Sequence, residues 1–72
     1  MGRIVFIGDE YLAMAFKIIG IETYAAYDVI EAEKLVNKTV ERDDVDILML
    51  PEDLYISLSN RYVHFKREGV NK

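Results

Sequence analysis

Hydrophobic residues along this chain occur in two kinds of pattern, short continuous runs and longer runs with helical spacing. Residues 3–7 (Arg-Ile-Val-Phe-Ile) and 46–50 (Asp-Ile-Leu-Met-Leu) are almost unbroken apolar runs, which is typical of strands covered on both faces. Residues 21–25 alternate only weakly between apolar and polar, as a less buried edge strand does. The pattern therefore predicts three strands, with the first in the centre of the sheet.

Three helices are predicted to follow these strands. The first covers residues 10–19, because Asp9 is placed to cap its N-terminus and Gly20 to end it. The second runs from Asp28, which opens a variant of the capping box, to about Arg42. The third starts at Pro51, since proline suits the first position of a helix, and ends near its basic residues and glycine, which are Lys66, Arg67 and Gly69.

Each predicted helix has an apolar stripe that is expected to face the core. The stripes follow the helical period and comprise Leu12, Ala15, Phe16 and Ile19 in the first helix, Val29, Ala32, Val36 and Val40 in the second, and Leu54, Leu58, Tyr62 and Phe65 in the third.

Alternation of strands and helices predicts a parallel sheet with helices on both faces. Right-handed crossovers and a central first strand give a three-layer, Rossmann-like α/β fold with the flavodoxin-like strand order 2-1-3, in one domain over residues 1–72. This order leaves strand 46–50 at an open edge, although it is apolar on both faces. We therefore expect that the sheet lacks a fourth strand and that the edge of 46–50 pairs with a second copy, giving a homo-oligomer.

Composition narrows the functional classes. The 72 residues are 51% hydrophobic and 31% charged, as in one small globular domain, and they include no cysteine for a disulfide or a cysteine metal site. The net charge of −4 argues against nucleic acid as a partner. The apolar run at the N-terminus is too short for a secretory signal, and no run is long enough to insert into a membrane, so we expect a cytoplasmic protein.

Four carboxylates follow the two apolar strands. They come at the carboxyl ends of strands that neighbour each other in a 2-1-3 sheet, and they are Asp9, Glu10, Glu52 and Asp53. Such a group can hold magnesium, as in receiver domains that accept a phosphoryl group. A receiver, however, needs an aspartate at the end of the third strand, where this chain has Leu50 and Pro51. We interpret the carboxylates as helix caps and predict no metal site.

The sequence contains few of the residue patterns that are typical of nucleotide binding or catalysis. The first strand-to-helix turn contains only Gly8 of the Gly-x-Gly-x-x-Gly pattern, so no nucleotide cofactor is expected. Ser57 and Ser59 lie within a predicted helix without glycine neighbours, and His64 is the single histidine of the sequence. We therefore predict no catalytic residues.

A second apolar stripe lies beside the first on helix 10–19. It consists of Tyr11, Met14 and Ile18 and leaves only Glu10, Ala13 and Lys17 as a polar strip. The apolar arc is wider than one sheet face covers, so the helix is either deeply buried or carries a docking surface. We predict that Tyr11, Met14 and Ile18 form a partner interface.

The sequence resembles the F subunit of the archaeal and vacuolar-type ATP synthases and ATPases. The resemblance covers about residues 4–54 and rests on five segments: Ile4-Val-Phe-Ile-Gly-Asp9, Phe16-Lys-Ile-Ile-Gly-Ile21, Glu31-Ala-Glu-Lys-Leu35, Glu41-Arg-Asp-Asp44 and Asp46-Ile-Leu-Met-Leu50. Family members commonly have Gly-Phe-Arg-Leu-Ala-Gly where this chain has Ala15-Phe-Lys-Ile-Ile-Gly20. Phe16 and Gly20 thus match, and Lys17 approximates the arginine.

The resemblance implies a non-catalytic protein on the rotating central stalk, whose partners are other central-stalk subunits and whose place is peripheral to the membrane. Family members continue into a fourth strand and a C-terminal helix, so we interpret the chain ending at Lys72 as a truncated or processed form. A receiver-like signalling module and a stand-alone α/β adaptor are the alternatives. Leu50 and Pro51 at the acceptor position favour the rotor protein over the receiver.

Overall fold

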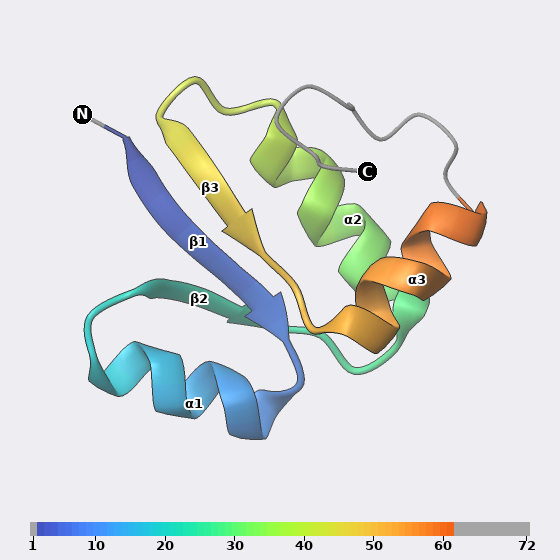
Figure 1. Ribbon diagram of the computed structural model, residues 1–72, viewed down its shortest axis with the longest axis horizontal. Coiled ribbons are helices and arrows are strands. Elements are labelled where there is room, and N and C mark those ends of the chain that lie inside the picture. The colour runs from blue at the N-terminus through green and yellow to red at the C-terminus, as the bar shows by residue number, and fades with distance from the viewer. Residues whose placement is uncertain (1, 62–72) are drawn as a thin grey trace.

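The computed structural model describes residues 2–61 and shows a parallel sheet between two layers of helices (Figure 1). In chain order the elements are β1 (Arg3–Gly8), α1 (Glu10–Ile18), β2 (Glu22–Ala25), α2 (Val29–Val40), β3 (Val45–Met49) and α3 (Glu52–Arg61). Within residues 2–61 the sheet has three strands in the order β2-β1-β3. The predicted α/β class, the central position of the first strand and the strand order are confirmed.

The register of the sheet decides which helices each side chain meets. Val5 of β1 pairs with Glu22 of β2 and Leu48 of β3. Because paired residues of parallel strands point to the same face, Val5 and Ile7 point toward α2 and α3. The alternate residue Phe6 points to the opposite face, where its ring stacks on Phe16 of α1.

The core lies between the sheet and the layer formed by α2 and α3. Val5, Ile7 and Leu58 are completely buried there, and Val36 is 1% exposed. Seven partly buried apolar residues pack around this cluster: Ala26, Val29, Leu35, Val45, Leu48, Leu50 and Leu54. The predicted inward positions Leu54 and Leu58 of α3 are thus confirmed, whereas Tyr62 and Phe65, with His64 and the stop at Lys66, Arg67 and Gly69, lie outside the described residues.

Both ends of α1 are closed as the sequence predicts. An Asp9 carboxylate oxygen accepts a hydrogen bond from the Leu12 backbone N–H at 2.8 Å. At the other end the backbone N–H groups of Gly20 and Ile21 donate to the carbonyls of Lys17 and Phe16. Gly20 has φ +91°, a left-handed conformation that glycine adopts at little cost, so this residue ends the helix.

Helix α2 begins with a reciprocal cap but differs from the prediction at its end. Asp28 accepts from the Glu31 backbone N–H, and the Glu31 carboxylate accepts from the backbone N–H of Tyr27. The predicted inward residue Val40 is 51% exposed, and Thr39 is buried instead. Thr39 can face the core because its hydroxyl donates to the Leu35 carbonyl at 2.8 Å, which satisfies the polar group locally.

Helix α1 is rotated relative to the predicted inward stripe. Ala13, predicted to lie on the polar strip, is 7% exposed, whereas Leu12 is 40% and Ile19 68% exposed, and Ala15 is also exposed. Of the predicted stripe, Phe16 is the residue that is half-buried, and its ring stacks on Phe6 of the sheet. The reason is that α1 packs mainly against β2 and β1, so the side of the helix toward β3 is only partly covered within residues 2–61.

Candidate functional site

The outer side of α1 carries the predicted interface residues. Tyr11 and Ile18 are each 79% exposed, and Met14 is 58% exposed. At 100° per residue, Tyr11 and Ile18 lie opposite the side on which Ala13 and Phe16 face the sheet. The deeply buried helix, which was the alternative prediction for this apolar arc, is therefore wrong. The structure brings these three side chains to one exposed helix surface and leaves their role as an interface untested.

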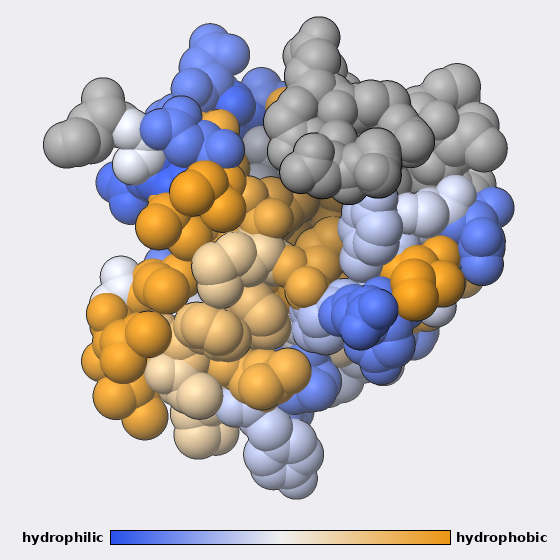
Figure 2. Space-filling view, viewed as in Figure 1, coloured by the Kyte–Doolittle hydropathy of each residue, from blue (hydrophilic) through white to orange (hydrophobic). Residues whose placement is uncertain are grey.

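A second apolar surface, which we call the open face, was not predicted from the sequence. It lies on the α1 side of the sheet and comprises Ile4, Ile47 and Met49 of the strands with Leu12 and Ile19, which lie on one flank of α1. Ile4 pairs with Ile47 and Phe6 with Met49, so the strand residues share the face on which Phe6 meets α1. Ile4 is 41% and Ile47 50% exposed. Figure 2 shows apolar surface running over this region from the strands to α1.

The open face exists because one helix is narrower than the sheet it covers. Helix α1 takes the β1 and β2 side, while β3 at the edge has no helix above it on this face within residues 2–61. The unbroken apolar run of residues 46–50, combined with its predicted edge position, was the signal in the sequence. This run indicated an unprotected strand, but it did not indicate that Leu12 and Ile19 of α1 would extend the same apolar surface.

The aspartates near the carboxyl ends of the strands accept hydrogen bonds from backbone N–H groups of the helices. Asp9 and Asp53 line a shallow cavity of about 160 Å³ together with Asp28, which was not among the four predicted carboxylates, whereas Glu10 and Glu52 do not line it. Asp9 and Asp28 cap α1 and α2, and Asp53 accepts from the Leu54 backbone N–H at 2.8 Å. Across residues 2–61, no three His, Cys, Asp or Glu side chains gather as a metal site would require.

The position where a receiver would carry its phosphate acceptor follows β3. Leu50 occupies it, and its side chain packs against the buried cluster of Val5, Ile7, Val36 and Leu58. An apolar side chain in that position cannot form an acyl phosphate. The geometry at the carboxyl edge thus offers helix caps and a packed leucine in place of a phosphorylation site.

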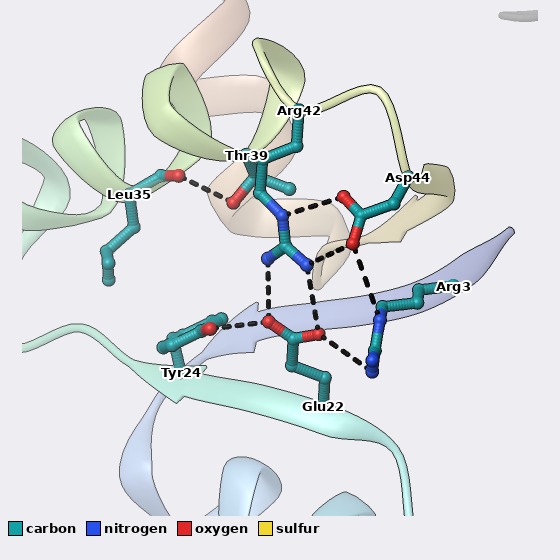
Figure 3. A network of polar contacts seen from close by, with 7 residues as sticks. All are labelled: Arg3, Glu22, Tyr24, Leu35, Thr39, Arg42 and Asp44. Carbon is teal, nitrogen blue, oxygen red and sulfur yellow. Dashed lines mark hydrogen bonds and ion pairs between the residues drawn. The ribbon is translucent and has the colours of Figure 1, made fainter.

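The other end of the sheet, where the three parallel strands begin, holds a network of ion pairs (Figure 3). The Arg42 guanidinium lies between two carboxylates, with Nη1 at 2.7 Å from Glu22 and Nη2 at 2.9 Å from Asp44. Arg3 approaches Glu22 at 3.6 Å and Asp44 at 3.4 Å. The network joins β1, β2 and the segment before β3. It was not predicted from the sequence, because the contact between residues 22 and 42 depends on how segments far apart in the chain pack together.

These contacts shift the pKa values of the network. Hydrogen bonds from Arg42, then from the Tyr24 hydroxyl, lower the pKa of Glu22 from 4.5 to about 2. The Arg42 hydrogen bonds also lower the pKa of Asp44, and donating to the Glu22 carboxylate raises the pKa of Tyr24. Each charge has an opposite charge as partner, so the network is suited to fixing the strands in place rather than to proton transfer.

A parallel sheet in the order β2-β1-β3, with α1 on one face and α2 and α3 on the other, defines a small Rossmann-like α/β protein. No helix in the part of the chain that the structure describes is long and apolar enough to cross a membrane.

The family model of the ATP synthase (F/14-kDa) subunit matches residues 4–71, and the chain belongs to this family. It is therefore an ATP synthase subunit, as the resemblance over residues 4–54 predicted. None of the curated proteins compared with the chain matches it.

Proposed function

We propose that the chain is the non-catalytic F subunit of the central stalk of an archaeal or vacuolar-type ATP synthase or ATPase. In this role it couples ATP synthesis or hydrolysis to ion transport through contacts with other subunits of the rotor. It lies on the cytoplasmic side, peripheral to the membrane. The observation that carries the proposal is the match to the ATP synthase (F/14-kDa) subunit over residues 4–71.

The surface of α1 supports a role in binding. Tyr11, Met14 and Ile18 form an exposed apolar strip on one helix, and tyrosine and methionine are enriched where proteins meet. A helix of this kind binds another protein by burying the strip against an apolar surface of the partner. We infer that this strip contacts another central-stalk subunit.

The experiment measures binding of the chain to the reconstituted central-stalk subunits of its ATP synthase. Met14→Asp places a charge in the centre of the strip, where binding would bury it without a partner. We expect the affinity to fall by about tenfold or more, since losing one central contact costs at least about 1.4 kcal/mol. Ile30→Asp on α2 is the matched control, because Ile30 is 54% and Met14 58% exposed.

Two outcomes contradict the proposal in different ways. If Met14→Asp binds as tightly as the native chain, the α1 strip is not part of the interface, although the chain can still belong to the central stalk. Absence of the native chain from the purified rotor, with binding to another part of the ATP synthase, removes the central-stalk assignment itself. Circular dichroism of each variant must match the native spectrum.

A further inference from the structure

Strand β2 is attached to the rest of the molecule in a different way from β1 and β3. Within the described residues, the apolar cluster between the sheet and the α2 and α3 layer contains side chains of β1 and β3 but none of β2. On that face β2 presents Glu22 and Tyr24, because these residues pair with Val5 and Ile7 of β1. Contacts of these two side chains, and not the apolar core, therefore hold β2 on this face.

Arg42 makes the contact that joins β2 to this layer (Figure 3). Its guanidinium donates to both oxygens of Glu22, at 2.7 Å from Nη1 and 3.3 Å from Nη2. It also donates to both oxygens of Asp44, at 3.0 Å from Nε and 2.9 Å from Nη2. A guanidinium held by two carboxylates in this forked geometry is stronger and more fixed than an isolated surface ion pair. The side chains of Arg42 and Glu22 are 31% and 21% exposed, so solvent screens their contact only in part.

The two sides of this contact belong to different parts of the fold. The segment that carries Arg42 and Asp44 is fixed to the central strand, since the Asp44 carbonyl accepts from the Arg3 backbone N–H at 2.7 Å. Glu22 begins the edge strand β2, shortly after the turn at Gly20 that joins this strand to α1. Helix α1 packs mainly on β2 and β1. A displacement of β2 from β1 therefore also removes much of the surface on which α1 packs.

We propose that the contact of Arg42 with Glu22 is a latch that holds β2 and α1, as one unit, against the rest of the fold. Without the latch this unit opens more readily, while the core between the sheet and the α2 and α3 layer stays closed. Elements that open locally have few buried apolar contacts, and no residue of β2 is fully buried. Strand pairing and the stacked rings of Phe6 and Phe16 remain as contacts between the unit and β1.

The unit carries the strip of Tyr11, Met14 and Ile18 on its outer side. The latch thus fixes the position of this strip relative to the α2 and α3 layer. The latch acts within one chain, so its test requires no partner protein and is independent of the central-stalk assignment.

Native-state hydrogen exchange, followed by NMR at neutral pH, tests the latch with Arg42→Gln. Two amides report on the unit: that of Ala26, which donates to the Gly8 carbonyl at 2.8 Å, and that of Ala13 within α1. We expect both to exchange about fivefold faster than in the native chain, because a forked, partly buried ion pair has been lost. The amide of Val36, in the buried part of α2, should change by less than about twofold.

Lys38→Gln is the matched control, because it removes the same charge from an exposed residue in the last turn of α2. Its exchange rates at Ala26 and Ala13 should match those of the native chain. In Arg42→Gln, equal acceleration at Val36 and Ala26 would show that Arg42 stabilises the whole fold and would overturn the latch. Unchanged exchange at Ala26 would overturn it as well, and acceleration at Ala26 without Ala13 would show that β2 and α1 are not one unit.

A double-mutant cycle tests whether Arg42 acts through Glu22. Glu22→Gln alone should accelerate the Ala26 amide about as much as Arg42→Gln, and the chain with both substitutions should exceed either by less than about twofold, because both remove the same contact. Effects that multiply would show that Arg42 acts through Asp44 instead and would overturn the latch. If Arg42→Gln does not fold, the comparison of Ala26 with Val36 in Glu22→Gln decides.

Discussion

The two faces of the sheet differ in how completely helices cover them. On one face α2 and α3 together bury Val5, Ile7, Val36 and Leu58 almost completely. On the other face α1 alone covers β1 and β2. Apolar residues of β1 and β3 on that face, including Ile4 and Met49, remain partly exposed to solvent. The same strands supply both faces, so the difference comes from the number of helices above them.

In this small chain, one face of the sheet therefore contributes mainly to the stability of the fold, and the other leaves apolar side chains available for binding. Burial of apolar surface is the main favourable contribution to folding, so the α2 and α3 face supplies most of it. Apolar side chains that remain exposed contribute little to folding and can contribute to association when another surface covers them. The proposed contact with the central stalk, the strip of Tyr11, Met14 and Ile18, lies on the helix above this half-covered face.

The largest expected effect comes from comparing two isoleucines of β1 that point to opposite faces. Ile7 is completely buried and Ile4 is 41% exposed. We expect Ile7→Ala to lower the free energy of unfolding by about 4 kcal/mol and Ile4→Ala by about 1 kcal/mol. Urea unfolding at a low protein concentration measures both. Equal losses would show that the α1 face contributes as much to stability as the α2 and α3 face.

A smaller effect is expected within α1. Phe16 is half-buried and its ring lies 4.4 Å from that of Phe6, measured between ring centroids. Phe16→Ala should cost about 3 kcal/mol, at the low end for a phenylalanine, because the ring is not fully enclosed. Leu12→Ala, on the flank toward β3, should cost less than about 1 kcal/mol, since Leu12 is 40% exposed. A larger loss for Leu12→Ala would mean that this flank is covered in solution.

The smallest effect concerns the ion network and appears as a dependence on pH. The pKa of Glu22 is about 2 in the folded chain and 4.5 in the unfolded reference, so its stabilising contribution is present above pH 4.5 and lost as pH falls toward 2. Glu22→Gln should therefore lower Tm near neutral pH, and its deficit against the native chain should shrink at low pH. Thermal unfolding followed by circular dichroism between about pH 6 and pH 2 measures this.

Glu41→Gln, which changes an exposed glutamate at the end of α2, is the control for this experiment. Its difference in Tm from the native chain should remain smaller than that of Glu22→Gln near neutral pH. A deficit of Glu22→Gln that stays constant down to about pH 2 would show that the carboxylate's charge does not stabilise the fold.

Local signals in the sequence predicted the order of the elements and both ends of α1. Asp9 and Gly20 close α1 as expected, because capping depends on the side chain and backbone within one turn. The strand order followed from the apolar runs and the handedness of crossovers. The resemblance to the F subunit, drawn from residues 4–54, also proved correct for the family.

The orientation of α1 could not be predicted in the same way. Its apolar arc is wide enough to present several faces to a sheet, and helical spacing alone favoured Leu12, Ala15 and Ile19 over Ala13. The structure buries Ala13 because the helix packs over β1 and β2, where a small side chain permits close approach. The same placement leaves Tyr11, Met14 and Ile18 exposed, as the predicted interface requires.

The sequence by itself thus determined the elements, their caps, their order in the sheet and the family, since each depends on neighbouring residues or on the chain's overall pattern. Only the tertiary structure decided which side of α1 is buried, that Glu22 meets Arg42, and that Ile4 and Ile47 form one surface with Leu12 and Ile19. These depend on the lateral position of one helix above the sheet and on the register between strands, and both are set by packing among residues far apart in the chain.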